Sequence, residues 1–235
     1  MSFKTDLEKY IPRKEQQDCI NFIDSEYQKN KESKFFLLNL PVGSGKSHLA
    51  LMISDWYLKN INGGSKIDII TNSKILQDQY SNTYGSINDL KGKENYACSE
   101  YGCSCAQGAE FNRLNKTSCD DCPYSNARNG YMSGKLSLTN FYLYILYSLY
   151  IPKLFEARGA NVLIVDEAHS FDDIMSDFIS IKITENIVKR LKFSNESEII
   201  KSLKKVNSIS TYIDFLKYLQ GEVGSTISDI EKALG

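Results

Sequence analysis

The chain has 235 residues, of which 28 are Lys or Arg and 29 are Asp or Glu, so its formal net charge is −1. Hydrophobic residues make up 42% and charged residues 24%, an ordinary globular composition that excludes a disordered chain, a collagen-like rod and a transmembrane bundle. The balanced charge also excludes a polybasic protein that holds nucleic acid by bulk attraction, so any nucleic-acid contact must be a local patch or groove.

Residues 1–85 alternate helical and strand patterns, and this alternation predicts a parallel sheet covered by helices. The apolar run 35–40 has the continuous character of a strand that is buried on both faces. In chain order we expect a helix around 18–27, a strand over 35–40, a helix after residue 46, a strand over 66–71 and a helix over 74–80 capped by Ser73.

A glycine-rich loop, Pro41 to Ser47, lies between the predicted strand and helix, which is the context that a phosphate-binding loop requires. Its core is G-x-G-K-S, although Leu40 stands where the full pattern has glycine. Such a loop turns successive backbone N–H groups toward one anion at the N-terminus of a helix. We therefore expect nucleotide phosphates to be bound by Gly43, Ser44, Gly45 and Lys46, with Ser47 on Mg²⁺.

A second acidic motif ends the apolar strand predicted over 162–165: Asp166, Glu167, Ala168 and His169. Asp166 is placed to hold Mg²⁺ beside Ser47, and Glu167 to orient or deprotonate an attacking water. His169 is placed to sense the terminal phosphate. Because both motifs follow strands of one parallel sheet, Lys46, Asp166 and Glu167 are the predicted catalytic residues.

Residues 86–135 differ from the rest, because they are rich in Cys, Gly, Asn and Ser and show little periodicity. The chain has no apolar signal sequence, so we expect a cytoplasmic location, or a nuclear one in a eukaryote, where thiols stay reduced. Free thiols at this density indicate a metal site that replaces a hydrophobic core. Spacing alone does not choose between iron and zinc. The candidate ligands are Cys98, Cys103, Cys105, Cys119 and Cys122.

The phosphate loop and the DEAH sequence resemble superfamily 2 helicases, and further segments resemble the XPD/DinG branch. The first and last cysteine segments, 95–98 and 122–128, and the segment 138–141 carry that resemblance. It implies an α/β fold with a RecA-like parallel sheet, helices on both faces, a cysteine-rich iron–sulfur insertion and a helical arch-like segment. The implied parts are the first part of the RecA-like domain at 1–85, the insertion at 86–135, the second part at 136–170 and the arch at 171–235.

The same resemblance implies a DNA helicase that hydrolyses ATP with Mg²⁺, moves 5′ to 3′ and carries a 4Fe–4S cluster. Cys98, Cys119 and Cys122 are the firmer ligands, and one of Cys103 and Cys105 is the fourth. Gln16 lies in a Q-motif-like segment, whose glutamine reads the adenine edge. The residues expected to contact single-stranded DNA or a forked duplex are Ser73, Lys74 and Gln79 in a motif-Ia-like stretch and Tyr124 and Arg128 beside the cluster.

Members of that branch carry a second RecA-like domain with an arginine finger, and no segment of these 235 residues is assigned to it. We therefore expect slow ATP turnover by the chain alone and a partner polypeptide, or a further part of the same one, that supplies this domain. Two alternatives stay open: a module that binds single strands and uses ATP as a switch without unwinding, and a zinc-stapled NTPase.

Overall fold

The computed structural model describes residues 10–30, 35–119, 121–180, 183–191, 193 and 195–234. By their internal contacts the residues divide into two units, Met1–Phe178 and Ile179–Gly235, and each is described by itself. None of the helices among the described residues is both long and apolar enough to cross a membrane.

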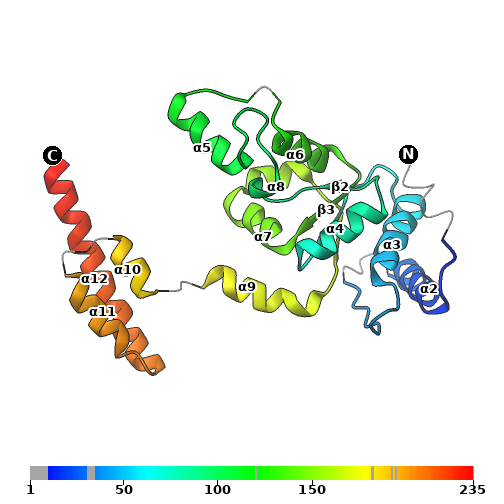
Figure 1. Cartoon of the computed structure of the whole chain (residues 1–235). Helices are drawn as coiled ribbons and strands as arrows, with labels where there is room; N and C mark the ends of the chain where they lie inside the picture. The colour runs from blue at the N-terminus through cyan, green and yellow to red at the C-terminus, as the bar shows by residue number, and fades with distance from the viewer. Residues whose placement is uncertain are drawn as a thin grey trace. The chain divides into compact units, whose positions relative to one another are not determined.

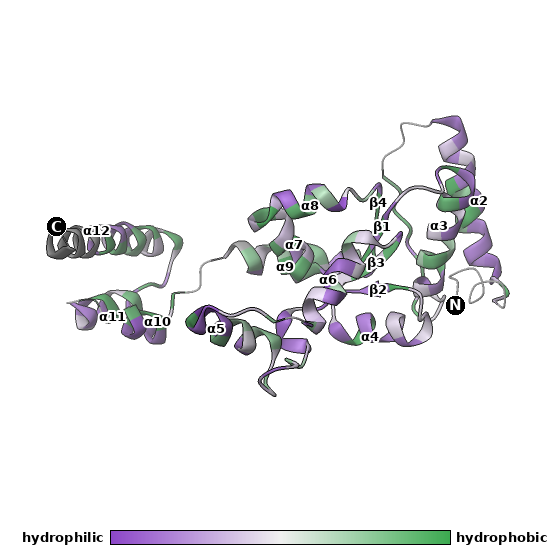
Figure 2. Cartoon of the chain, turned by 90° about the horizontal axis from the view of Figure 1, so that it is seen from above, coloured by the Kyte–Doolittle hydropathy of each residue, from purple (hydrophilic) through white to green (hydrophobic). Residues whose placement is uncertain are grey.

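The first unit is built on a parallel sheet with helices packed around it (Figure 1), and the strand order is β2-β3-β1-β4, labelled in Figure 2. The central strand β1 pairs with β3, where Thr71 lies opposite Asn140, and with β4, where Ile70 lies opposite Val165. The carboxyl ends of three strands therefore meet at one edge, as the sequence predicts. The strands are β1 (Ile67–Thr71), β2 (Asn88–Asp89), β3 (Leu136–Asn140) and β4 (Val162–Val165).

Helices cover both faces of this sheet, because alternate residues of each strand point to opposite sides. On β1, Ile67 and Ile69 pack in one cluster with residues of α3 and α4, whereas Ile70 packs on the other face with α7 and α9. The helices of this unit are α2 (Lys14–Lys29), α3 (Lys46–Asn60), α4 (Lys74–Thr83), α5 (Cys105–Asn115), α6 (Pro123–Ser133), α7 (Phe141–Tyr150), α8 (Pro152–Arg158) and α9 (Phe171–Ile179), with short 3₁₀ turns η1 (Lys93–Asn95) and η2 (Ala168–Ser170).

Most of the helices predicted in the first part of the chain are confirmed. The helix expected around 18–27 is α2, which is largely hydrophilic in Figure 2 and buries only Gln16 and Ile23. The predicted cap of α4 is also present, since the Leu76 N–H donates to Ser73 Oγ at 3.3 Å. Ser73 thus satisfies one of the backbone donors that every helix leaves unpaired in its first turn.

The strand predicted over 35–40 is wrong. This segment forms no strand in the described sheet, and its side chains alternate between exposed and half-buried. Phe35 and Leu37 are 94% and 90% exposed, so the apolar run is not buried on both faces. Apolar sequence alone does not specify a strand, because a strand also needs a partner for its backbone N–H and C=O groups.

The sequence analysis missed β2 and β3. The residues of β3 read LSLTN, in which polar Ser137 and Thr139 interrupt the apolar run. Both hydroxyls are buried but bonded to backbone carbonyls, Ser137 to Tyr131 and Thr139 to Leu90. A buried strand can therefore carry these residues without an unpaired polar group.

Residues 86–135 are more regular than their sequence indicates, because they form α5 and α6. They also contribute to a hydrophobic cluster that includes Leu90, Tyr124 and Tyr131 together with Leu143 and Tyr147 of α7. The prediction that this block builds no hydrophobic core is therefore wrong, since the cysteines lie within a core that aromatic side chains supply. The metal site itself stays a prediction.

The second unit is helical, as predicted for the end of the chain, and it has a core of its own. That core joins Val188, Phe193, Ile199 and Phe215. Its helices are α10 (Glu185–Leu191), α11 (Glu196–Lys204) and α12 (Ile209–Leu234).

Candidate nucleotide site and cysteine cluster

The glycine-rich loop has the backbone shape of an anion-binding turn. Gly43 and Gly45 have φ angles of +81° and +80°, a left-handed conformation that glycine adopts without a Cβ penalty. Gly45 also precedes the first residue of α3, so the free N–H groups of that helix begin at Lys46. The hydroxyl of Ser44 is buried and makes no hydrogen bond. A buried, unpaired donor in this loop fits a site that a ligand completes.

Gln16 holds the glycine-rich loop through hydrogen bonds to its backbone carbonyls. Its side-chain N–H₂ group donates to the carbonyls of Ser44 and Gly45, both at 3.0 Å. Its carbonyl oxygen accepts from Tyr10 Oη at 2.9 Å and from the Arg13 N–H at 3.0 Å. The side chain is fully buried, so its amide is occupied by protein groups and holds the loop. A Cβ at position 45 would lie 2.5 Å from Gln16 Nε2, and only glycine fits there.

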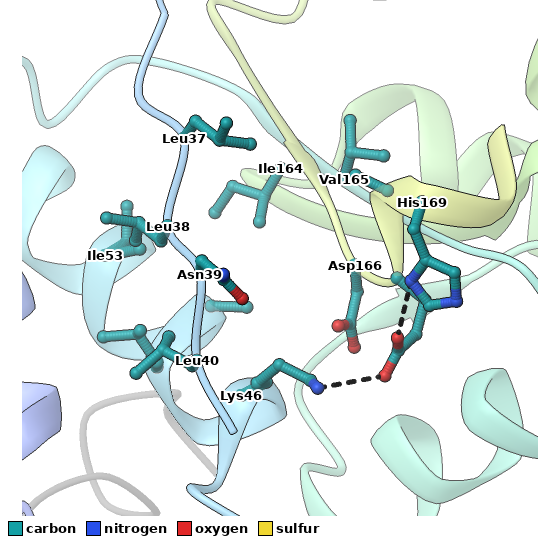
Figure 3. A pocket seen from close by; sticks show the side chains of 14 residues that line it. Leu37, Leu38, Asn39, Leu40, Lys46, Ile53, Ile164, Val165, Asp166 and His169 are labelled. Atoms are coloured by element: carbon teal, nitrogen blue, oxygen red, sulfur yellow. Dashed lines mark ion pairs between the residues drawn. The ribbon is translucent and has the colours of Figure 1, made fainter. Parts of the chain in front are cut away.

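The acidic residues follow β4 and face the loop. Lys46 Nζ lies 3.5 Å from Glu167 Oε1, and His169 Nδ1 lies 3.3 Å from Glu167 Oε2 (Figure 3). The backbone of Glu167 is left-handed, with φ = +57°, which is rare for a residue with a side chain. Strained backbone of this kind is characteristic of functional sites, and here it turns the carboxylate toward Lys46.

Asp166 is largely buried between the sheet and α4. Tyr80 Oη donates to Asp166 Oδ2 at 3.0 Å, and Ser47 lies close enough to the same hydroxyl to act on its pKa. Burial raises the pKa of Asp166, and the Tyr80 hydrogen bond and the charge of Lys46 work against that rise. Burial, together with the nearby Asp166 charge, raises the pKa of Tyr80 well above its usual value, so its hydroxyl remains a donor.

A cavity of about 330 Å³ opens beside these residues. One wall is the segment 37–40 and the other is the end of β4, with Ile164 facing the segment in Figure 3. Lys46, Asp166 and Glu167 lie at its polar end. The structure therefore brings together the predicted phosphate-binding lysine and both predicted acids around one opening.

The five clustered cysteines pack in or against one hydrophobic cluster, in which Cys98 and Cys105 are buried. Burial raises the pKa of Cys105, and its neighbours Cys122 and Cys98 act in the same direction. Burial, with Cys98 and Cys122, also acts to raise the pKa of Cys119. The thiol of Cys103 instead contacts its neighbouring backbone, the Ser104 carbonyl, at 3.5 Å. Among the described residues, however, no group of three or more His, Cys, Asp or Glu side chains has the arrangement of a metal site.

Polar groups surround these thiols. Asn112 Nδ2 lies 2.9 Å from Cys119 Sγ, and burial raises the pKa of Cys105. Burial acts most strongly to raise the pKa of Cys122, but polar contacts with Ser125, Cys105 and the Tyr124 backbone together outweigh it and lower that pKa. Helix α5 comes closest to Cys98 at Gly108, where a Cβ would lie 2.6 Å from Cys98 Sγ.

The predicted nucleic-acid residues differ in their surroundings. Lys74 and Gln79 are exposed on α4, while Ser73 is half-buried as the helix cap and Arg128 is half-buried on α6. Tyr124 is only 8% exposed and its hydroxyl contacts that of Tyr147. A ring buried in this way packs in the core and presents no face to a base, so Tyr124 is no longer a candidate for base stacking.

Two residues of the site were missed by the sequence analysis, Tyr80 and Arg13. Arg13 Nη1 donates to the Gly43 carbonyl at 2.5 Å. Tyr80 lies three residues after Gln77 on the buried face of α4, but its contact with Asp166, 86 positions away, could not be read from the sequence.

Comparison with known proteins agrees with the geometry of this site. No curated protein matches the chain. A family model does match it, over residues 9–200: the res subunit of type III restriction enzymes, ResIII. This family is a superfamily 2 helicase-type ATPase domain, whose parallel sheet and helices agree with the fold described above. The matched residues are most of the chain, which therefore belongs to the ResIII family of helicase-type motor domains.

Proposed function

We propose that this chain is the N-terminal motor part of an XPD/DinG-like DNA helicase that binds ATP and single-stranded DNA and moves 5′ to 3′. The observation that carries the proposal is the convergence of Lys46, Asp166 and Glu167 at one end of the cavity. A lysine at a helix N-terminus and two carboxylates at a strand end are the groups that phosphoryl transfer to water requires.

Each residue has a role in this proposal. Lys46 and the N–H groups of the loop bind the phosphates, and Glu167 orients the attacking water and accepts its proton. Ser47 and Asp166 hold Mg²⁺, which supplies charge neutralisation to the phosphate oxygens. Gln16 shapes the loop through Ser44 and Gly45, a role that its hydrogen bonds favour over reading adenine.

The variant Glu167→Gln tests the assignment of the base. It removes the carboxylate but keeps the shape of the side chain, so we expect binding of a fluorescent ATP analogue to persist while hydrolysis falls by about 10²-fold or more. Equilibrium fluorescence and phosphate release measure the two quantities, with and without a single-stranded oligonucleotide.

The matched control is Glu156→Gln, which changes an exposed glutamate on α8. Binding of the ATP analogue and ATP hydrolysis should both remain as in the unmodified chain. Unchanged hydrolysis in Glu167→Gln would contradict the proposed base. ATP binding that alters oligonucleotide affinity without any hydrolysis in the unmodified chain would favour the ATP-switched binding module.

We further propose that Cys98, Cys105, Cys119 and Cys122 bind a 4Fe–4S cluster. The support is that these four cysteines pack in one cluster together with Cys103, whose thiol contacts the neighbouring Ser104 carbonyl at 3.5 Å. Asn112 and Ser125 direct hydrogen bonds at two of the sulfurs, as groups around protein-bound clusters do. The cluster would draw the four sulfurs together and join the start of α5 to the start of α6.

The pair Cys105→Ser and Cys103→Ser tests this ligand set. After anaerobic purification we expect iron and inorganic sulfide in equal amounts, with visible absorption, in the unmodified chain and in Cys103→Ser. Cys105→Ser should lose both. Zinc without iron in the purified chain would indicate a structural zinc site instead of an iron–sulfur cluster. Loss of iron only in Cys103→Ser would overturn the assignment of Cys105 as the fourth ligand.

For the nucleic acid, we propose that the strand runs over the exposed side of α4, where Lys74 and Gln79 lie, and continues toward Arg128. Support comes from the exposure of Lys74 and Gln79 and from the helix N-terminus capped by Ser73, which offers N–H groups to a phosphate. Such contacts bind the backbone without reading sequence.

A further inference from the structure

Tyr80 is fully buried on the inner side of α4, in the cluster that joins α3, α4 and the sheet. A phenylalanine would fill this space equally well, so packing does not explain the hydroxyl. The hydroxyl donates to Asp166 Oδ2 at 3.0 Å and lies close enough to Ser47 for that side chain to act on its pKa. These are the two residues that the proposed function assigns to Mg²⁺.

The bond from Tyr80 restricts the carboxylate of Asp166. With Oδ2 held by a buried donor, rotation about the Cβ–Cγ bond is limited, and the plane of the carboxylate is set relative to Ser47. Metal ligands in proteins are commonly oriented in this way by hydrogen bonds from neighbouring groups. Tyr80 is fully buried and does not line the cavity, whereas Asp166 does, so Tyr80 would act through Asp166.

The helix that carries Tyr80 also carries the proposed nucleic-acid residues. Lys74 lies in the first turn of α4, and Gln79 precedes Tyr80 on the exposed side. A ten-residue helix moves as one body, so a shift caused by a bound strand at Lys74 also moves the Tyr80 hydroxyl. The two sites are therefore joined by a single rigid element.

We propose that Tyr80 is a positioning residue that orients Asp166 for Mg²⁺ and couples the metal site to a strand bound on α4. The inference rests on the proposed function, because it takes Asp166 as a metal ligand and α4 as a nucleic-acid surface. It goes further by naming the group through which the two communicate.

Tyr80→Phe in the full chain tests the inference, because it removes only the hydroxyl. Affinity for a fluorescent ATP analogue is measured in Mg²⁺ and in a chelator. We expect the gain in affinity that Mg²⁺ provides to fall roughly tenfold, as for loss of one hydrogen bond to a charged group. Affinity in the chelator should change by less than about twofold. A purely structural role would lower both affinities together and would overturn the inference.

Tyr131→Phe is the matched control, since Tyr131 Oη also donates to a buried aspartate, Asp68, at 3.0 Å. This variant should lose comparable thermal stability and keep the full Mg²⁺ effect. If it loses the Mg²⁺ effect as Tyr80→Phe does, the assignment to Tyr80 is wrong.

A single-stranded oligonucleotide provides the second readout. Saturating oligonucleotide should change nucleotide affinity in the unmodified chain and in Tyr131→Phe, and should leave it unchanged in Tyr80→Phe. Equal coupling in all three proteins overturns the role of Tyr80, as does the absence of coupling in the unmodified chain. Failure of the unmodified chain to bind the nucleotide at all would instead overturn the proposed function, and the inference with it.

Discussion

Arg158 and Asp68 form an ion pair at 2.9 Å, with side chains that are 1% and 0% exposed. Arg158 also donates to the Gly134 carbonyl at 2.6 Å, and Tyr131 donates to the other oxygen of Asp68. Burial raises the pKa of Asp68, although Arg158 and Tyr131 both act to lower it. The pair joins the end of α8 to β1 and to the turn after α6.

Arg158→Met should destabilise the chain by about 3–5 kcal/mol, because it leaves a buried carboxylate without its cation. The loss of Arg158 raises the folded-state pKa of Asp68 further. The loss of stability caused by the unpaired carboxylate is therefore absent at pH values below the unfolded-state pKa of Asp68, where the carboxyl is protonated in both states. It is complete at pH values above the folded-state pKa of Asp68. Urea unfolding at several pH values should show that the deficit shrinks as the pH falls.

The double variant Asp68→Leu with Arg158→Met serves as the control for this pair. Replacing both charges by apolar groups removes the unpaired carboxylate, and most of the lost stability should return. If the single and double variants are equally unstable, the charge is not the cause.

At the residue scale, the sequence predicts which residues carry the chemistry of the site better than it predicts which residues surround them. Lys46, Asp166 and Glu167 could be named because their chemistry belongs to short sequence motifs. The burial of Tyr124 could not be predicted from the sequence, because Tyr124 packs with Leu90 and Tyr147, which come from other segments. The occupied amide of Gln16 likewise depends on the Ser44 and Gly45 carbonyls, 28 and 29 positions away.

At the scale of elements, local patterns predicted α2, α3, α4, β1 and β4, because each buries a regular apolar face or follows a strong turn. The same reasoning failed for 35–40 and for β3, in opposite directions. The first is apolar but lacks a backbone partner, and the second is half polar but has partners for its backbone and its hydroxyls. Strand formation depends on pairing, which one segment alone does not reveal.

In the insertion, residues 86–135, helix formation was likewise hard to predict from local sequence alone. Gly, Asn and Ser made 86–135 look aperiodic, yet Ser104 caps α5 with its side chain, and Pro123 starts α6. Such residues are typical of helix starts as well as of loops. The aromatic residues that complete its core come partly from α7, outside the insertion.

At the scale of the molecule, the arginines of the first unit are engaged elsewhere than at Asp166 and Glu167. Arg13 binds the Gly43 carbonyl, Arg113 pairs with Glu110, Arg128 lies beside Tyr147 and Arg158 is buried with Asp68. A motor of this kind needs an arginine opposite the terminal phosphate, so we propose that a second RecA-like domain provides it.

The 235-residue chain alone should therefore bind ATP but hydrolyse it slowly. A polypeptide that carries the second RecA-like domain should raise the rate on the order of 10³-fold, as arginines supplied from outside an ATPase do. Steady-state phosphate release with and without that polypeptide measures the effect. Fast hydrolysis and unwinding by the chain alone would contradict this expectation.

The contact between Lys46 and Glu167 has a consequence for the proposed mechanism. Each group partly neutralises the charge of the other, so a singly charged anion gains little by approaching Lys46. In the proposed mechanism a triphosphate, with its several negative charges, competes with Glu167 for Lys46. Nucleotide binding would then free the Glu167 carboxylate to accept the proton of the attacking water.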